Sequence, residues 1–346
     1  MSFWTGKRVL VTGHTGFKGS WLSLWLHDLG AQVFGLALEP DTTPALFDQL
    51  GLADKLDHRI GDIRDAALVR DRVAEVRPDV VFHLAAQPLV LASYDDPVAN
   101  WDSNVMGTVH VLDALRQLDQ PCAAVMITTD KVYENREWLH PYREGDRLGG
   151  HDPYSASKSA CEIAIASYRK SFFTDHPVRV VSARAGNVIG GGDWAENRIL
   201  PDIVRALSAG QAIPVRNPHA RRPWQHVLEP LAGYLRLAER LSNGHPVAEA
   251  YNFGPETHDV KAVGDLVQGA LALWPGTCLD QSDPNARHEA SLLSLGIEQA
   301  RVDLDYAPRW DFANGLAKSV EWYHAVHKGA EPLATTRAQI ADFGAP

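Results

Sequence analysis

A glycine turn near the N-terminus restricts the fold of this chain more than any other feature. In VLVTGHTGFKGSWLSLWL, the apolar run Arg8–Val11 precedes Gly13, Gly16 and Gly19, and a helical pattern follows over Gly16–Leu29. Gly13 permits a tight turn, Gly16 lets an anion approach the helix N-terminus, and Gly19 allows close helix–sheet packing. The spacing is GxxGxxG, but strand, turn and helix in this order predict a dinucleotide site, with a structural turn as the alternative. The expected cofactor contacts here are Gly13, Thr15, Gly16, Phe17, Lys18 and Gly19.

Apolar runs alternate with helical patterns along the first half of the chain. Further strands are expected at Gln32–Ala37, Val80–Leu84, Ala123–Thr128 and Val178–Ala183, and further helices at Ala66–Val76, Val98–Leu118 and Tyr154–Ser171. Continuous Val, Ile and Leu runs are typical of parallel strands buried on both faces. Because crossovers between such strands are right-handed, the pattern predicts an α/β fold with a doubly wound parallel sheet of the Rossmann type.

The alternation of apolar runs and helical patterns ends after residue 186. The segment GNVIGGGDWAENRILP is loop-rich, RNPHARRPWQHV is basic and aromatic, and shorter helical patterns follow at Glu229–Leu241 and Val260–Ala272. We therefore expect a dinucleotide-binding domain over residues 1–186, to which segments near 224–254 return. A smaller substrate-binding cap is expected over residues 187–330 and a peripheral tail over 331–346.

The ends of the later strands offer the remaining cofactor contacts. Asp62 and Ile63 would end a third strand and border an adenine, whereas Leu84, Ala85 and Ala86 would line the nicotinamide ribose. Ala37 occupies the position where an acid for the adenosine ribose is expected, so Glu39 or Asp41 just beyond is the candidate, with a solvated loop as the alternative. No arginine stands there to receive a 2′-phosphate, which favours NAD over NADP.

Composition excludes several classes of protein. The net charge of −10 argues against non-specific binding of nucleic acid. The three cysteines form no CxxC pair, which favours reduced thiols in the cytoplasm. We expect no signal peptide and no membrane span, because no apolar run approaches ~18 residues. The fifteen histidines show no metal-binding spacing, so no metal is expected.

A tyrosine and a lysine in PYSASKSACE carry the expected redox chemistry. Tyr154 and Lys158 are four residues apart and share one face of a helix. An ammonium beside a phenol favours the phenolate and lowers its pKa from ~10 towards neutrality. Such a tyrosine can take a proton from a substrate hydroxyl while hydride leaves the same carbon. Thr128 or Thr129, at the end of the preceding strand, would share a hydrogen bond with that hydroxyl.

These motifs together resemble the extended short-chain dehydrogenase/reductase family. The resemblance covers roughly residues 7 to 325 and rests on the glycine turn, NVMGT at 104–108, the strand-end threonine and YxxxK. It implies that Lys158 also holds the ribose of a tightly bound NAD and that Thr128 contacts the cofactor. In this family the helices that match Val98–Leu118 and Tyr154–Ser171 form a four-helix contact between subunits, so a homodimer is expected.

The acid–base pair in TTDKVY resembles the nucleotide-sugar 4,6-dehydratase branch of that family. The resemblance implies that Tyr154 deprotonates the 4-hydroxyl as hydride leaves C4, that the C5 proton is then removed as the C6 hydroxyl departs, and that the hydride returns to C6. Asp130 is expected to protonate the leaving oxygen. Lys131 would remove the C5 proton or stabilise the enolate, and the sequence leaves both roles open.

Longer strings are most similar to CDP-glucose 4,6-dehydratases within this branch. They are GHTGFKGSWL, AAQPLV, TTDKVY, GNVIGGGDW, RPWQHVLEPL and YNFGP, whereas Leu91 and Arg301 depart from the pattern, and His288 and Glu289 resemble another motif of the branch. The alternatives are a dehydratase of UDP-N-acetylglucosamine or dTDP-glucose, a 4-epimerase, and a scaffold that binds NAD without turnover. The candidates for binding the nucleotide sugar are Gln87, Asn104, Asn187, Asn197, Arg198, Arg221 and Arg222.

Overall fold

Seven parallel strands form the central sheet of the computed structural model, which describes residues 2–283 and 290–346. Their order across the sheet is β11-β6-β5-β4-β1-β2-β3. The strands are β1 (Arg8–Thr12), β2 (Gln32–Ala37), β3 (Asp57–Ile60), β4 (Val80–His83), β5 (Cys122–Ile127), β6 (Val178–Ala185) and β11 (Ala250–Phe253). The chain reverses its direction of winding between β1 and β4, which is where a doubly wound sheet opens to a ligand.

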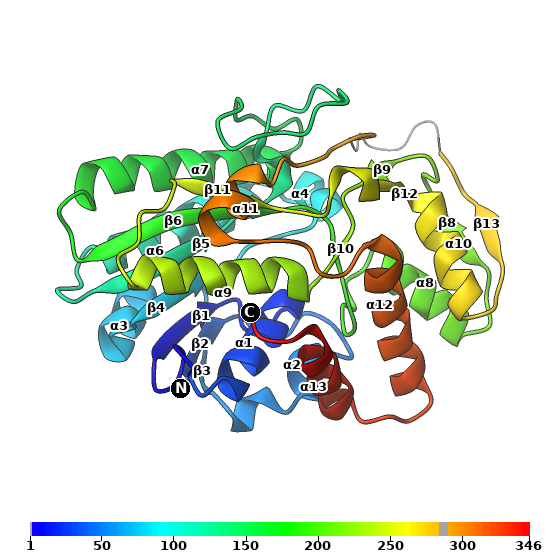
Figure 1. Cartoon of the computed structure of the whole chain (residues 1–346), viewed down its shortest axis with the longest axis horizontal. Coiled ribbons are helices and arrows are strands. Elements are labelled where there is room, and N and C mark those ends of the chain that lie inside the picture. Colours follow the sequence, from blue (N-terminus) through cyan, green and yellow to red (C-terminus); the bar gives the residue numbers. More distant parts are fainter. Residues whose placement is uncertain (1, 284–289) are drawn as a thin grey trace.

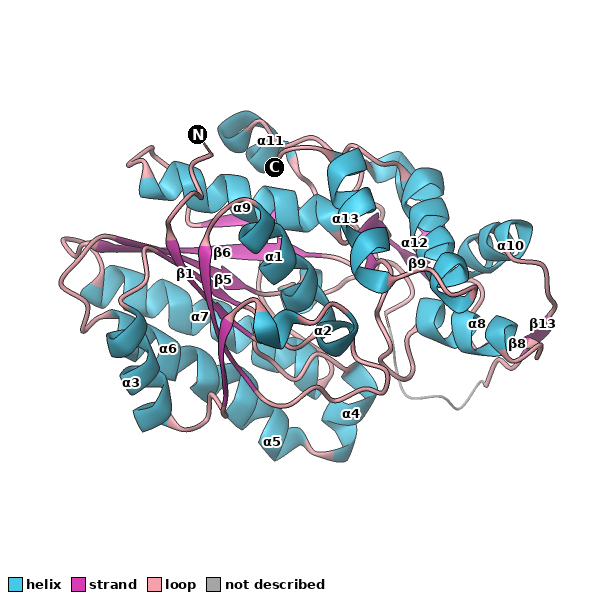
Figure 2. Ribbon diagram, turned by 90° about the horizontal axis from the view of Figure 1, so that it is seen from below, coloured by secondary structure: helices cyan, strands magenta, loops and turns pink. Residues whose placement is uncertain are grey.

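Helices cover both faces of this sheet (Figures 1 and 2). Apolar residues of α3, α6 and α7 form one core beneath it, and those of α1 and α9 belong to a larger core on the opposite face. The longer helices of the sheet domain are α1 (Phe17–Asp28), α3 (Ala66–Val76), α6 (Gly107–Leu115), α7 (Pro153–Phe172) and α9 (Leu228–Ser242). Shorter elements are α2 (Leu46–Gln49), η1 (Leu52–Asp54), α4 (Val90–Asp95), α5 (Pro97–Trp101), the π-turn η2 (Asp102–Met106), η3 (Asp130–Val132) and α11 (Glu298–Leu304).

A second group of elements lies beside the sheet, on the right of Figure 1. It contains α8 (Ile199–Ser208), η4 (Thr257–Asp259), α10 (Val263–Leu273) and α12 (Phe312–His327). Three two-stranded ladders join it: β7 (Val188–Ile189) with β10 (Gln225–His226), β8 (Ile213–Val215) with β13 (Cys278–Asp280), and β9 (Arg221–Arg222) with β12 (Lys261–Ala262). Pro223, between β9 and β10, reaches Gly186 just after β6, so this group meets the carboxyl ends of the strands.

The structure confirms the predicted fold class and corrects several details. The expected helix Val98–Leu118 is divided into α5, η2 and α6. Asp62 and Ile63 follow β3 rather than end it, because this edge strand stops at Ile60. No helix among residues 2–283 and 290–346 is both long and apolar enough to cross a membrane. The candidates His288 and Glu289 lie outside the described residues.

The expectation of a peripheral tail was wrong. Residues 332–343 form α13 (Pro332–Phe343), whose Ile340 and Phe343 are buried in the larger core. The ring of Phe343 packs edge-on against Trp25 of α1, and Arg337 forms an ion pair with Asp28 at 2.7 Å. Ile340 and Phe343 are three residues apart and therefore face the same side of a helix. The tail thus completes the packing of the helix that follows the glycine turn.

Candidate active site

The glycine turn has the shape that a pyrophosphate requires. Gly13 has φ +76°, and a Cβ there would lie 2.7 Å from the backbone nitrogen of Ala85. A Cβ on Gly19 would lie 2.0 Å from the carbonyl oxygen of Gly13, so the protein's own packing demands both glycines. Gly16 differs, because a Cβ there would meet only an ordinary contact at 3.5 Å. Gly16 is the exposed N-cap of α1 and makes no side-chain cap, which leaves the helix N-terminus open to an anion. These residues fit NAD.

The adenosine end of the turn is less acidic than a ribose site requires. Ala37 is buried at the end of β2, and the hydroxyl of Thr15 donates to the carbonyl oxygen of Leu38 at 2.9 Å. Asp62 accepts hydrogen bonds from Arg64 at 2.6 and 2.8 Å, and these bonds hold its pKa below the ordinary value. Ile63 is buried against Gly107 of α6. Asp62 is therefore engaged with its neighbour, and the structure does not choose between Glu39 and Asp41.

The two threonines that end β5 face different partners. Thr129 caps η3, donates to Asp130 Oδ1 at 2.9 Å and forms a side-chain hydrogen bond with Tyr154. Thr128 points to the other side and donates to the carboxylate of Glu162 on α7. Of the two candidates, Thr129 is therefore the one that lies beside Asp130 and Tyr154. The hydroxyl of Thr128 is buried and already bonded, so the predicted contact of this residue with the cofactor, which stays a prediction, would involve its other atoms.

Asp130 has the environment of a proton donor. It is 2% exposed, and its Oδ2 has no hydrogen-bond partner among the described residues. This oxygen lies 3.2 Å from the position that a Cβ would take on Gly186, so the missing side chain of Gly186 leaves room beside the acid. Burial raises the pKa of Asp130, against the opposing effects of Lys131, Thr129 and Arg222. The carboxyl group is thereby biased towards its protonated form.

Tyr154 and Lys158 lie together at the start of α7, but their pKa values do not follow the simple expectation. Burial raises the pKa of Tyr154 to about 12, while Thr129 and Arg198 act in the opposite direction. Lys158 is buried, its Nζ donates to the carbonyl oxygen of Ile127 at 3.3 Å, and burial lowers its own pKa. Burial of the phenol therefore outweighs the lowering of its pKa that was expected from Lys158.

Helix α7 contacts the end of β5 at three successive levels. Tyr154, Lys158 and Glu162 are spaced by four residues along one face of the helix and contact Thr129, Ile127 and Thr128, respectively. Lys131 completes the group, because its Nζ lies 5.9 Å from the centre of the Tyr154 ring. The sequence YxxxKxxxE contained the signal for Glu162, which the sequence analysis missed.

Glu162 is also half of a buried ion pair. Arg184 of β6 donates to both of its carboxylate oxygens, at 2.9 and 3.0 Å, and the two residues are 4% and 4% exposed. Ser182 donates to the same carboxylate, and Arg184 also donates to the hydroxyl of Tyr133, which in turn donates to Asn252. The network joins β5, β6, β11 and α7 directly behind the catalytic residues.

The candidates for substrate binding fall into two groups. Arg198 and Arg222 act on two of the candidate catalytic residues: Arg198 influences the pKa of Tyr154, and the buried Arg222 influences that of Asp130. Arg198 is held by Asp193 at 3.0 Å. The exposed Arg221 instead donates to the carbonyl oxygen of Val260 at 2.6 Å. The sequence could not distinguish these adjacent arginines, since alternate residues of a strand face opposite ways.

The four amide candidates have mostly internal partners. Asn104 is 1% exposed and its side chain bonds to Gln87, Asn100 and Ser157, so it positions these segments, and its contact with the sugar stays a prediction. The Gln87 side chain bonds to the backbone of Leu89. Asn197, with φ +62°, accepts from Arg216 at 2.8 Å, and the backbone of Asn187 pairs with Gln225. Asn187 and Asn197 therefore remain candidates at the border of the cap.

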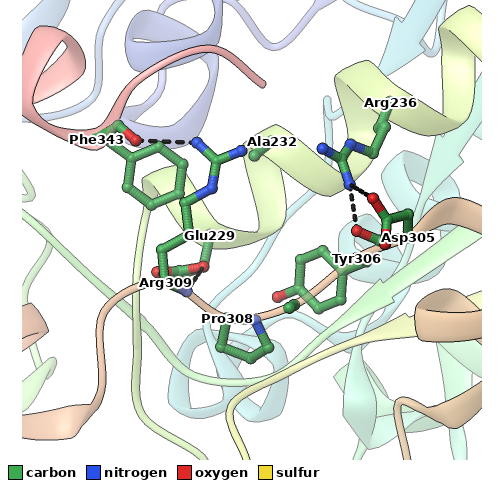
Figure 3. A pocket seen from close by; sticks show the side chains of 9 residues that line it. Glu229, Ala232, Arg236, Asp305, Tyr306, Pro308, Arg309 and Phe343 are labelled. Carbon is green, nitrogen blue, oxygen red and sulfur yellow. Dashed lines mark hydrogen bonds and ion pairs between the residues drawn. The ribbon is translucent and has the colours of Figure 1, made fainter.

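A separate pocket of about 250 Å³ lies between α9 and residues 305–309 (Figure 3). Glu229 is 1% exposed beside it and accepts from the backbone N–H groups of Arg309 and Trp310. Burial raises the pKa of Glu229 from 4.5 to about 7. A raised carboxyl pKa means that the folded state holds the proton more tightly, so this contribution to stability is full below pH 4.5 and is lost as the pH rises through about 7.

Glu229→Gln should therefore flatten the pH dependence of stability. Between pH 4.5 and 8, the wild type should lose up to roughly 3 kcal/mol of unfolding free energy that the variant does not lose. Urea unfolding of both proteins at several pH values measures the difference. Parallel curves for the two proteins would contradict a carboxyl group that titrates near neutrality.

Comparison with known proteins agrees with this arrangement. The family model described as GDP-mannose 4,6 dehydratase matches residues 10–319. CDP-glucose 4,6-dehydratase of Salmonella typhimurium is 47% identical over 99% of this chain and 97% of its own length. dTDP-glucose 4,6-dehydratase of Streptomyces antibioticus is 32% identical over 94% and 95% of the two chains.

A solved structure gives the same result for the fold. The structure of dTDP-glucose 4,6-dehydratase from Streptomyces venezuelae, with NAD bound, superposes with a TM-score of 0.79 at 25% identity and covers 94% of this chain and 99% of its own. The folds therefore agree over nearly their whole lengths. With the family model and the two relatives above, it follows that the chain belongs to the GDP-mannose 4,6-dehydratase family, within the nucleotide-sugar 4,6-dehydratase branch of the extended short-chain dehydrogenases/reductases.

Proposed function

We propose that this protein is a CDP-glucose 4,6-dehydratase, which converts CDP-D-glucose to CDP-4-dehydro-6-deoxy-D-glucose and water. The observation that carries the proposal is the buried Asp130, whose free Oδ2 lies in the same site as Lys131 and Tyr154. A simple oxidoreductase needs a tyrosine and a lysine, whereas elimination needs a further acid and base. The identity of 47% over nearly the whole length to a CDP-glucose 4,6-dehydratase supports this choice of nucleotide.

The glycine turn fits NAD as the resident cofactor. The backbone of Gly16 and the first turn of α1 would hold its pyrophosphate, and the segment Leu84–Ala86, which borders Gly13, would hold the nicotinamide ribose together with Lys158. When bound, NAD supplies a hydride acceptor and a positively charged nicotinamide. Arg198 already opposes the rise of the pKa of Tyr154, and a positive charge on a bound nicotinamide would add to this effect.

The side chains divide the proton transfers among them. Tyr154 Oη takes the proton of the 4-hydroxyl, and Thr129 orients the phenol by its hydrogen bond. The resulting 4-ketone makes the C5 proton acidic, and Lys131 Nζ removes it or stabilises the enolate. Asp130 Oδ2 gives its proton to the C6 oxygen, which leaves as water. Arg198 and Arg222 supply positive charge for the diphosphate from the cap, for which we propose residues 187–330.

A panel of nucleotide sugars tests this function. The purified protein should convert CDP-glucose into a product with the alkaline absorbance of a 4-keto sugar. It should convert UDP-N-acetylglucosamine, dTDP-glucose and GDP-mannose at least about tenfold more slowly. Conversion of another nucleotide sugar in preference would reassign the substrate. A 4-epimerised product without a keto group would replace dehydration by epimerisation, and no conversion of any sugar would leave an NAD-binding scaffold.

We also propose that the protein is a homodimer built on α5, η2 and α7. Large apolar side chains are exposed there: Val98 is 78%, Trp101 41% and Met106 42% exposed on α5 and η2, and Ile163 is 62% exposed on α7. The three elements pack against one another. A second copy bound through the same elements would give a four-helix contact and bury this surface.

Ile163→Asp should therefore convert the dimer into a monomer. In a symmetric contact each copy contributes the substitution, and every buried unpaired carboxylate costs about 3 kcal/mol or more. Val302→Asp is the matched control, because Val302 is 81% exposed on α11, outside this surface. Sedimentation velocity should show a dimer for the wild type and for the control. A monomeric wild type, or dissociation of both variants, would contradict the proposed interface.

Cytoplasmic location is proposed on the basis of the thiols. Cys122 and Cys161 are buried and unpaired, and Cys278 is exposed and unpaired. Free thiols are typical of a reducing compartment.

A further inference from the structure

Lys18 places a cation where the dipole of its helix disfavours one. It is the second residue of α1, whose first turn has no acidic residue, and helix N-termini attract anions rather than cations. Its Nζ donates to the hydroxyl of Tyr234 on α9 at 3.0 Å and lies 5.1 Å from the centre of that ring. Burial raises the pKa of Tyr234, so this partner is a neutral phenol that carries no charge to balance the ammonium.

The charged groups around Lys18 are those of the catalytic centre. The pKa of Lys18 is lowered to about 7, first by burial and then by the charges of Lys158 and Arg198, whereas Asp130 raises it. Asp130 is itself biased towards its neutral form by burial. The charges that act on Lys18 therefore have a positive excess.

This excess must act differently on the two oxidation states of the cofactor. The hydride acceptor has to lie beside the sugar carbon whose hydroxyl Tyr154 deprotonates, and hence among these same side chains. Oxidised nicotinamide carries a positive charge that reduced nicotinamide lacks, while the pyrophosphate is common to both forms. A nearby ammonium is repelled by the first form only.

We infer, on the basis of the function proposed above, that Lys18 biases the site towards the reduced form of NAD. The bias favours oxidation of the sugar, in which C4 gives up a hydride and its hydroxyl gives a proton to Tyr154. Oxidation at C4 has to precede the loss of water, because only the ketone makes the C5 proton acidic. Tyr234 serves as a positioning residue that holds the ammonium in this place.

The ratio of the dissociation constants for NAD⁺ and NADH tests the inference without any sugar. Lys18→Met removes the charge but keeps an unbranched side chain, and should lower Kd(NAD⁺)/Kd(NADH) by about tenfold. Lys18→Arg keeps the charge and should keep the ratio within about threefold of the wild type. Tyr234→Phe loses the hydroxyl that positions the ammonium, and should give a ratio between those of the wild type and Lys18→Met. Competitive fluorescence titration of the full-length protein measures each constant at pH 6, below the pKa of about 7 of Lys18, where its side chain is an ammonium.

Two results would overturn the inference. An equal loss of affinity for both forms in Lys18→Met would assign the ammonium to the pyrophosphate that they share. An unchanged ratio would show that the charge does not reach the nicotinamide. If Lys18→Met does not fold, the same titration on Lys18→Gln decides. Because no sugar is present, a wild-type protein that fails to dehydrate CDP-glucose would refute the proposed function and leave this measurement standing.

Discussion

Replacement of Asp130 by asparagine is expected to slow formation of the 4-keto-6-deoxy product by about 100- to 10,000-fold, the usual contribution of a positioned general acid. Asparagine keeps the shape of the side chain and its bond with Thr129 but cannot supply the proton that the departing C6 oxygen needs. Tyr154 and Lys158 are untouched, so the first oxidation should continue. The 340 nm absorbance of reduced NAD should therefore rise and persist after CDP-glucose is mixed with the variant.

Lys131→Met provides the comparison for this variant. If Lys131 is the C5 base, its loss should stop exchange of the C5 hydrogen with deuterium from solvent, whereas Asp130→Asn should retain that exchange. If Lys131 only stabilises the enolate, exchange should be slowed without being abolished.

The raised pKa of Asp130 predicts the direction of the pH dependence of turnover. Because the acid must be protonated to act, turnover should fall as the pH rises through that pKa. An Asp130→Asn variant that forms product at the wild-type rate would refute elimination by this acid.

The second large effect concerns stability. Glu162→Gln should cost about 3–5 kcal/mol of unfolding free energy, because it leaves the guanidinium of Arg184 buried without a counter-charge. Glu249→Gln is the control: Glu249, which immediately precedes β11, pairs with Arg169 of α7, but its side chain is 64% exposed, and its loss should cost less than about 1 kcal/mol. Urea unfolding at neutral pH measures both.

A double replacement separates the charge from the packing. Glu162→Gln with Arg184→Met removes both charges, and should recover a large part of the stability that either single variant loses. Recovery is expected to be incomplete, because Thr128, Ser182 and Tyr133 lose bonds as well. Similar small losses for Glu162→Gln and Glu249→Gln would contradict the importance assigned to burial.

The sequence predicted those features that depend on local pattern. Strands such as β2 and helices such as α3 were placed correctly, because long apolar runs and helical periodicity determine them. β3 was not placed from its own residues, since Asp57 and Arg59 are exposed and the strand lacks an apolar run. The spacing of Tyr154 and Lys158 correctly predicted that both residues lie on one face of a helix, since it depends on one helix only.

Features that depend on which way a side chain points could not be predicted. The sequence offered Thr128 and Thr129, and Arg221 and Arg222, as equivalents, although within each pair the two side chains have different partners. The amide of Asn104 could not be known to be buried, nor could the effect of desolvation on the pKa of Tyr154. The sequence did show that Lys18 is a cation in the first turn of a helix, which is unusual. Its contact with Tyr234, on a helix distant in the sequence, could not be predicted.

The three-level contact between α7 and the end of β5 has a consequence for thermal motion. Phenol, ammonium and acid are carried by two backbone segments that cannot shift independently, so their displacements should be correlated. Vibration of the helix then moves proton donor and acceptor in the same direction, and the gap between them varies less than the position of either. Reactive distances in this protein should accordingly be insensitive to warming until β5 and α7 separate, at which point every proton transfer fails together.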